Sequence, residues 1–298
     1  MRHTFPLKFV EAVARYGSIR KAAEVLSITS TALNRRILGL EEELGVELFE
    51  RLPRGVRLTS AGEIFLHHAR MQLADLERVK SQIADLKGIR RGHVAVACSQ
   101  AMLPSFLPAQ IAHYRGEHPG VTFDVLVRDR AAAEQALVEM TADLAIVFEP
   151  LQLADFQILH TEPQPIHVIM SNEHPLAEKE RVRLGDCLQY PLALPRSHIG
   201  VRHLMEVALQ NSQLKLEPVI ESDSFEFLRY HALHEQMLTF QIAVGLPVKA
   251  DLMGLVTREL DNRDMPLGVL YLGQLRGRTL SVAAAKFANQ LIAALALK

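Results

Sequence analysis

Hydrophobic residues in the first part of the chain recur at helical spacing in three short segments. The pattern predicts one helix that ends at Gly17-Ser18, a second over residues 19–26 and a third over residues 30–45. The small Ala22-Ala23 pair in the second segment would let another helix cross it closely, as a helix-turn-helix requires. The inward positions of the third helix are predicted to be Ala32, Leu33, Ile37, Leu40 and Leu44.

A hairpin and a long helix are predicted next. Residues 50–59 alternate as strand, turn and strand, with Arg54-Gly55 at the tip. Residues 59–63 carry an N-cap and a capping acid, and the helix that they start runs without Pro or Gly to Lys87. Its narrow apolar seam favours packing on a second copy of itself, although packing within its own domain would give the same pattern. The seam consists of Leu76, Val79, Ile83 and Leu86.

From His93 the pattern changes to strands that alternate with helices. Strands are predicted over 93–99, 121–127 and 143–149, with helices over 103–119 and 131–140 between them. A second α/β unit follows, and it includes a predicted strand over 237–247. The chain then returns to the first unit with a predicted strand over 267–273 and a predicted helix over 282–296. Such alternation predicts an α/β fold with a parallel sheet, in which ligands bind at the carboxyl ends of strands.

The exposed face of the third helix has the chemistry of a DNA-reading helix. Its first turn offers the short polar side chains of Ser30, Thr31 and Asn34, and Arg35 follows. Polar tips suit base edges in the major groove and cations suit phosphates, although an ordinary solvated helix is also polar outside. The hairpin adds three arginines, which favour the DNA backbone or the minor groove: Arg51, Arg54 and Arg57.

The distribution of charge along the chain indicates two regions that bind different partners. The 298 residues include 49% apolar and 22% charged residues. Residues 1–92 contain 16 basic and 11 acidic residues, whereas the rest contains 17 and 23, so the front is net basic and the remainder net acidic. No apolar run resembles a signal peptide or a membrane span, which predicts a cytoplasmic protein. The thiols of Cys98 and Cys187 and the 13 histidines form no recognisable disulfide or metal-binding pattern.

Several ordered motifs over residues 5–65 resemble the signature of the LysR family of bacterial transcriptional regulators. In chain order, the first motifs are FVEAVA, then GS, then AAE with a Leu two residues after its Glu. The later motifs are RRI, LEEELGV, LFER, RGVRLT and AGE. Further motifs, including GHVAV at 92–96, EHPGV at 117–121 and ADLAI at 142–146, resemble the effector domain of that family. Ser30 and Asn34 stand where the family commonly has Gln and Ser, so the family's base preference does not carry over: Ser is a shorter reader than Gln, and Asn can pair with adenine through two bonds.

The resemblance implies an α/β protein with an N-terminal winged helix-turn-helix, a linker helix and a C-terminal, two-subdomain effector domain similar to periplasmic binding proteins. We expect the DNA-binding domain over 1–62, the linker helix and hinge over 63–92 and the effector domain over 93–298. Its subdomains would cover 93–165 with 267–298, and 166–266. The expected DNA contacts are Ser18, Arg20, Thr29, Ser30, Thr31, Asn34, Arg35, Arg36, Arg51, Arg54 and Arg57.

The resemblance also implies the partners. They are double-stranded promoter DNA, a small-molecule effector that is expected to be an anionic metabolite, further copies of the chain in a homodimer or homotetramer, and RNA polymerase; no cofactor, metal or membrane is expected. Ser99 and Gln100 would offer a hydroxyl and backbone N–H groups to an anion at a helix start. The other expected wall residues follow or end later strands: Phe148, Ser197, His198 and Gln241.

Two other classes of protein share parts of this pattern. An enzyme would be expected to carry a GxSxG, P-loop or GxGxxG motif, or an acid and base at catalytic spacing, and the C-terminal part has none of these. A secreted solute-binding protein would have a similar fold, but it would begin with a signal peptide, whereas this sequence starts with a predicted DNA-reading segment. The sequence therefore favours a regulator, and the identity of the effector and the target genes stays open.

Overall fold

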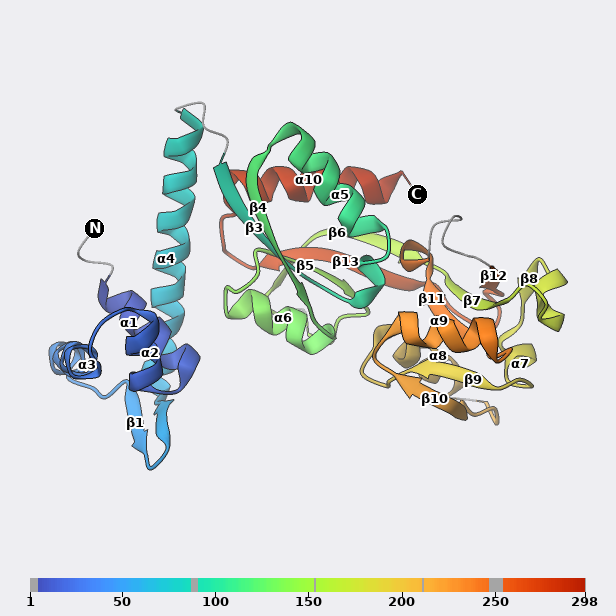
Figure 1. Cartoon of the computed structure of the whole chain (residues 1–298), viewed down its shortest axis with the longest axis horizontal. Helices are drawn as coiled ribbons and strands as arrows, with labels where there is room; N and C mark the ends of the chain where they lie inside the picture. Colours follow the sequence, from blue (N-terminus) through green and yellow to red (C-terminus); the bar gives the residue numbers. More distant parts are fainter. Residues whose placement is uncertain (1–4, 87–90, 153, 211, 247–253, 298) are drawn as a thin grey trace. The chain divides into compact units, whose positions relative to one another are not determined.

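The computed structural model describes residues 5–86, 91–152, 154–210, 212–246 and 254–297. The chain divides into two compact units, residues 1–83 and residues 84–298. The first unit, at the blue end of the colour scale in Figure 1, is helical apart from one hairpin. The second is mixed α/β.

Three helices form the start of the first unit: α1 (Phe5–Tyr16), α2 (Ile19–Val25) and α3 (Ser30–Leu44). This is the predicted helix-turn-helix arrangement, in which the small Ala22 and Ala23 of α2 are fully covered. Its core consists of the buried side chains of Phe9, Val10, Ala12, Val13, Ala22, Ala23, Leu33, Ile37, Leu48, Phe49 and Leu66. Leu44 was expected in this core but is 43% exposed, because it lies in the last turn of α3, just before the left-handed Gly45 that ends the helix.

Side-chain caps fix where the helices of this unit begin. The Ser18 hydroxyl accepts a hydrogen bond from the backbone N–H of Lys21 at 3.4 Å, ahead of α2. The Thr29 hydroxyl accepts one from Ala32 at 3.2 Å, ahead of α3. Such N-caps are each worth about 1 kcal/mol of helix stability. Ser18 and Thr29, which are both expected DNA contacts, therefore also stabilise the starts of α2 and α3.

The hairpin consists of the antiparallel strands β1 (Phe49–Leu52) and β2 (Gly55–Leu58). Its register pairs Leu52 with Gly55, which leaves a two-residue turn at the tip. Gly55 has a φ of +117°, and a Cβ on it would lie 2.3 Å from the carbonyl oxygen of Gly17. Since the next residue, Val56, donates its N–H to that same oxygen at 3.0 Å, Gly55 lets the hairpin lie directly on the turn between α1 and α2.

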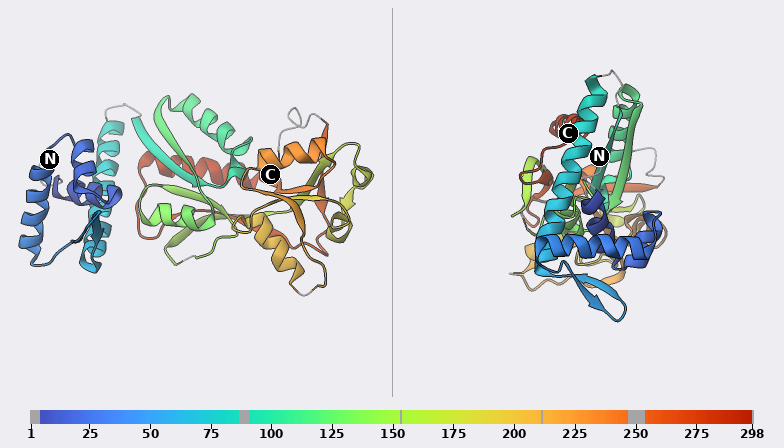
Figure 2. Two further views of the ribbon diagram at one scale, coloured as in Figure 1. Left: turned by 60° about the horizontal axis from the view of Figure 1, so that its bottom comes forward. Right: turned by 90° about the vertical axis from the view of Figure 1, so that its left-hand side faces the viewer.

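Helix α4 (Ser60–Leu86) completes the first unit as predicted, with the Thr59 hydroxyl accepting from Gly62 N at 3.0 Å at its start. The right-hand view of Figure 2 shows α3 and the hairpin at one end of α4. Residues 88–90 of the predicted hinge and the side chain of Leu86 lie outside the described residues.

The larger sheet of the second unit has five strands in the order β4-β3-β5-β13-β6. Strand β3 runs parallel to β4 and to β5, as the alternating pattern predicts. Figure 1 shows α5 and α10 on one side of this sheet and α6 on the other. The elements are β3 (Arg91–Cys98), α5 (Phe106–Glu117), β4 (Gly120–Val127), α6 (Arg130–Val138), β5 (Leu144–Phe148), β6 (Phe156–Gln164), β13 (Gly268–Leu275) and α10 (Val282–Ala296).

A second group of strands and helices lies between β6 and β13 in the chain. It contains a four-stranded sheet in the order β11-β7-β12-β8 and a parallel pair, β9 with β10. One apolar core includes residues from all three sheets of the unit. The elements are β7 (Ile166–Ser171), β8 (Arg181–Val182), α7 (Leu184–Cys187), β9 (Leu192–Pro195), α8 (Gly200–Leu209), β10 (Pro218–Ser222), α9 (Phe225–His234), β11 (Thr239–Ile242) and β12 (Leu255–Leu260).

The predicted parallel pairing is present in β4-β3-β5 but does not extend over the whole of the larger sheet. Strand β13 is antiparallel to both of its neighbours, β5 and β6, and β7 is antiparallel to β11 and β12. Strands β6 and β12 were not predicted, because β6 carries polar residues at most positions and β12 has a partly exposed surface. The strand expected over 237–247 is shorter, since β11 ends at Ile242 and a 3-10 turn, Ala243–Gly245, follows.

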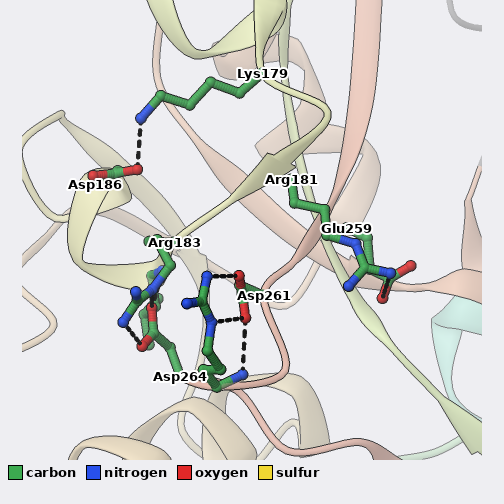
Figure 3. A network of polar contacts seen from close by, with 9 residues as sticks. Lys179, Arg181, Arg183, Asp186, Glu259, Asp261 and Asp264 are labelled. Atoms are coloured by element: carbon green, nitrogen blue, oxygen red, sulfur yellow. Dashed lines mark hydrogen bonds and ion pairs between the residues drawn. The ribbon is translucent and has the colours of Figure 1, made fainter.

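A surface network of ion pairs fastens β8 and α7 to the turn after β12 (Figure 3). In one pair Arg183 donates hydrogen bonds to the carboxylate of Asp264. These bonds, more than any other effect, lower the pKa of Asp264. The other pairs are Lys179 with Asp186 at 2.7 Å, Arg263 with Asp261 at 2.6 Å and Arg181 with Glu259 at 3.9 Å.

Candidate functional site

The expected DNA-reading face of α3 is exposed in the first unit. Ser30, Thr31, Arg35 and Arg36 are exposed, whereas Asn34 is half-buried. The Arg36 guanidinium lies over the ring of Phe9, with its carbon 5.4 Å from the ring centroid. The two side chains therefore form a cation–π contact. The face is therefore polar at its N-terminal turn and cationic one turn later.

The three hairpin arginines have different surroundings. Arg51 donates from Nη2 to the side-chain oxygen of Asn34 at 3.0 Å, which joins β1 to α3. Arg57 is paired with Glu50 across the hairpin at 2.6 Å. Arg54 at the tip is exposed, and in the described part of the chain neither it nor Arg35 has an ion-pair partner.

Helix α2 also carries an exposed cation from the list of expected DNA contacts, Arg20. It is exposed and lies 3.6 Å from Glu24, one helical turn further on. An exposed pair of this kind contributes little to stability, so Arg20 can exchange its partner for a phosphate at small cost.

Helix α4 presents part of its predicted seam to solvent. Leu76 and Val79 are half-buried and Ile83 is 49% exposed. Ile64, on the first turns of the same helix, is 74% exposed. Large apolar side chains left uncovered in a single chain suit a surface that packs on a second copy.

The second unit contains a cavity of about 120 Å³ where its sheets meet. Four of the residues expected to bind an effector line it: Ser99, Gln100, Phe148 and His198. Ser99 and Gln100 lie at the end of β3, where the Ser99 hydroxyl accepts from Ala101 N at 3.3 Å and Gln100 Oε1 accepts from Phe225 N at 3.3 Å. The second bond joins the end of β3 to the start of α9.

Two expected wall residues lie elsewhere. Gln241 is 2% exposed inside β11, and its Oε1 accepts a hydrogen bond from the backbone N–H of Ile242 at 2.9 Å. Ser197 is exposed in the loop after β9, and the cavity wall in the described part of the chain includes neither residue.

Two polar side chains of the wall, His198 and Asp223, lie close together. His198 Nε2 lies 3.2 Å from the carboxylate of Asp223, and Arg196, which does not line the cavity, lies 3.8 Å from the same carboxylate. Arg130, the first residue of α6, lines the cavity as well and is 8% exposed. Sequence reasoning missed Arg130, because in the sequence it looks like an ordinary exposed cation next to the N-cap residue Asp129.

The two cysteines are unsuited to thiolate chemistry. Cys98 and Cys187 are both free and buried, and burial raises the pKa of each to about 12. Within the described residues no group of three His, Cys, Asp or Glu side chains could hold a metal ion.

Comparison with known families decides what the two units are. Residues 6–63 match the family described as bacterial regulatory helix-turn-helix protein, lysR family, and residues 87–296 match the LysR substrate binding domain. The chain belongs to the LysR family of transcriptional regulators. This LysR-type regulator therefore has a DNA-binding helix-turn-helix unit and an effector-binding unit, and its family consists of regulators rather than enzymes.

Individual relatives agree. The chain is 28% identical to the HTH-type transcriptional activator CmpR of Synechocystis sp. over 218 residues, or 73% of this chain and 71% of that protein. A full-length OxyR variant from Pseudomonas aeruginosa has the same fold, with a TM-score of 0.74 at 19% identity over 99% of this chain and 94% of that one. Full-length CbnR in complex with its target DNA also matches, with a TM-score of 0.57 at 17% identity over 98% and 99% of the two chains. Among the described helices of this LysR-type regulator, none is long and apolar enough to cross a membrane.

Proposed function

We propose that this regulator binds a specific promoter site as a dimer or tetramer, and that a small anionic metabolite in the cavity of the second unit controls that binding. The observation that carries the proposal is the exposed polar first turn of α3 beside an arginine-bearing hairpin, in a chain that also contains an effector-binding domain. The reading head would cover residues 1–62, the linker helix and hinge 63–92, and the effector domain 93–298. The subdomains of that domain would be 93–165 with 267–298, and 166–266.

In this proposal the first turn of α3 enters the major groove. Ser30, Thr31 and Asn34 are the base-reading side chains, since short polar groups at a helix start reach base edges. Arg35 and Arg54 contact phosphates, because they are exposed and have no protein partner in the described residues. The remaining contacts come from Ser18, Arg20, Thr29, Arg36, Arg51 and Arg57.

Dimerisation would place two reading heads on one duplex. The partly uncovered side chains of Leu76, Val79 and Ile83 on α4 support a helix-to-helix interface, which would include Leu86 at its end. Two copies related by twofold symmetry suit an inverted-repeat site. A dimer of such dimers would give the tetramer, and contact with RNA polymerase at the promoter stays a prediction.

The control mechanism is linkage between the two kinds of binding. A ligand in the cavity contacts residues from both halves of the effector domain, including Ser99 and His198. It would favour the arrangement of the two halves in which those contacts are made, and thereby change how the reading heads are held. Only a difference in ligand affinity between the two arrangements can drive this change.

The test is to sequence the genomic fragments that the full-length protein retains, with and without pools of cellular metabolites. We expect a small set of fragments with a shared inverted repeat, whose retention changes with one acidic fraction. Fragment retention that is the same with every pool would contradict the proposed control by an effector.

A further inference from the structure

Arg130 is the most unusual charged residue of the cavity wall. It is 8% exposed, and its Nε and Nη1 atoms are buried without a hydrogen-bond partner in the described residues. A buried cation whose N–H groups are unsatisfied is costly. Arg130 is also the first residue of α6, and a cation is unfavourable at a helix N-terminus. Stability of the domain does not explain a guanidinium in this place.

Three carboxylates whose charge acts on Arg130 are engaged with other partners. The oxygens of Glu149, Glu134 and Asp129 accept hydrogen bonds from backbone N–H groups instead. Burial lowers the pKa of the Arg130 guanidinium, and the three carboxylates oppose this effect through their charge alone. The donors to these carboxylates are the N–H groups of Val269, Leu151, Gln152 and Ala132, at 2.7 to 2.9 Å.

A second feature of the same wall also favours an anion. Helix α8 begins at the cavity, where Ile199, Gly200 and Val201 line it, and the N-cap residue Ile199 provides no side-chain hydrogen bond. A Cβ on Gly200 would lie 2.5 Å from the carbonyl oxygen of Phe148, so only glycine fits there. The N–H groups of an uncapped helix start and the positive end of its dipole attract negative charge.

The rest of the wall is largely apolar, and this limits the chemistry of the rest of the ligand that carries the negative charge. Apolar side chains interact best with a hydrocarbon or aromatic body, whereas a hydrated inorganic ion would leave them unfilled. The apolar members of the wall are Ala101, Val127, Ala133, Ile146, Val147, Phe148, Ile199, Val201, Phe225 and Ile242.

We propose that Arg130 binds the carboxylate of a small monocarboxylic acid that has an apolar body, and that Arg130 is therefore the residue that selects the charge of the effector. The inference rests on the proposed function, because it assigns the chemistry of the same cavity. A single negative charge is favoured over a doubly charged phosphate, because the carboxylates of Glu149, Glu134 and Asp129 already lie near the Arg130 guanidinium.

The test compares full-length wild type, Arg130→Met and the control Arg115→Met. Arg115 is an exposed cation on α5, and it is not among the residues that line the cavity. Calorimetric titration uses carboxylates from acetate through butyrate to benzoate, the matching primary amides, and inorganic phosphate. We expect at least one carboxylate to bind wild type and Arg115→Met more tightly than its amide and than phosphate, and to bind Arg130→Met about tenfold or more weakly.

A measurement without ligand separates this role from a structural one. The Nε and Nη1 atoms of Arg130 have no hydrogen-bond partner among the described residues, so replacing this side chain removes two unsatisfied buried donors. The thermal midpoint of ligand-free Arg130→Met should therefore equal or exceed that of wild type. A clearly lower midpoint would assign Arg130 a structural task and overturn the inference. Equal binding of amide and carboxylate, no binding of any carboxylate to wild type, or unchanged binding to Arg130→Met would overturn it as well.

Retention of promoter DNA distinguishes this inference from the proposed function. If ligand pools change DNA retention in wild type but carboxylates bind no better than amides, only the assignment to Arg130 fails. If a carboxylate binds through Arg130 and DNA retention never responds to it, the proposed control of DNA binding fails while Arg130 keeps its ligand.

Discussion

The side-chain oxygen of Asn34 accepts a hydrogen bond from Nη2 of Arg51 at 3.0 Å, and this bond links α3 to the hairpin. The bond has a consequence for base recognition, because it places a guanidinium beside the amide that would read a base. Asn alone can pair with adenine, which offers one acceptor and one donor in the major groove. The Asn34 amide N–H groups and the remaining Arg51 donors together suit guanine, which offers two acceptors.

The first prediction concerns this pair. Asn34→Ala and Arg51→Ala should each reduce discrimination at the same base position, by about 1–3 kcal/mol, while binding to random duplex changes less for Asn34→Ala. The double variant should lose less than the sum of the two, since the residues act through one bond. Selection of binding sites from a random library for each variant measures this. Losses that add, or that fall at different base positions, would show that the two side chains read DNA independently.

The second prediction concerns phosphate contacts. Arg35→Ala and Arg54→Ala should weaken binding to all duplexes alike and lower the slope of log affinity against log salt concentration by about 1 each. Arg57→Ala is the matched control, because Arg57 is already paired with Glu50 and its removal should change the slope less. Affinity measured over a salt series checks this. An equal change for all three variants would contradict the distinction between paired and unpaired arginines.

The third prediction tests how the hairpin is held. Gly55→Ala should destabilise the first unit by about 1–3 kcal/mol, since φ is +117° and the new Cβ would meet the Gly17 carbonyl oxygen. Gly39→Ala is the control, because Gly39 is helical, has open space around it and should gain about 0.5–1 kcal/mol. Urea unfolding followed by circular dichroism measures both, and equal stabilities would show that the hairpin does not need Gly55.

The fourth prediction concerns pH. Because Arg183 lowers the pKa of Asp264 in the folded protein, the native state binds fewer protons than the unfolded chain near that pKa, and stability is lost as the pH falls. Asp264→Asn should therefore lose less thermal stability than wild type between about pH 5 and pH 2. Asp124→Asn, at an exposed carboxylate on β4, is the control and should behave like wild type. The contrary result is an Asp264→Asn midpoint that falls as steeply as that of wild type.

Local patterns predicted much of the fold, but not its sheet directions. Helix α10 has the bounds that its apolar spacing predicts, and α3 and α4 begin where Thr29 and Thr59 can cap them. Periodicity shows that a strand is buried, not which neighbour it pairs with or in which direction, so the antiparallel β13 was missed. In β11 all four residues are buried, so alternation could not show which way Gln241 points.

Part of the candidate site was also predictable. Ser99 directly follows β3 and Phe148 ends β5, and strand ends meet at one edge of an α/β sheet, which brought them to one cavity. Arg130 could not be distinguished in the sequence from an ordinary exposed cation next to a capping aspartate. Its burial and its missing partners depend on how Glu134 and Glu149 bind distant backbone groups, which only the tertiary structure shows.

The most direct test of the account is the affinity of the full-length protein for a retained genomic fragment, compared with a scrambled duplex of the same length and composition at one salt concentration. The account predicts a preference of about a thousandfold or more for the genomic fragment, most of which Asn34→Ala and Arg51→Ala remove. A folded, oligomeric preparation that binds both duplexes equally would contradict the claim that α3 and the hairpin read DNA sequence.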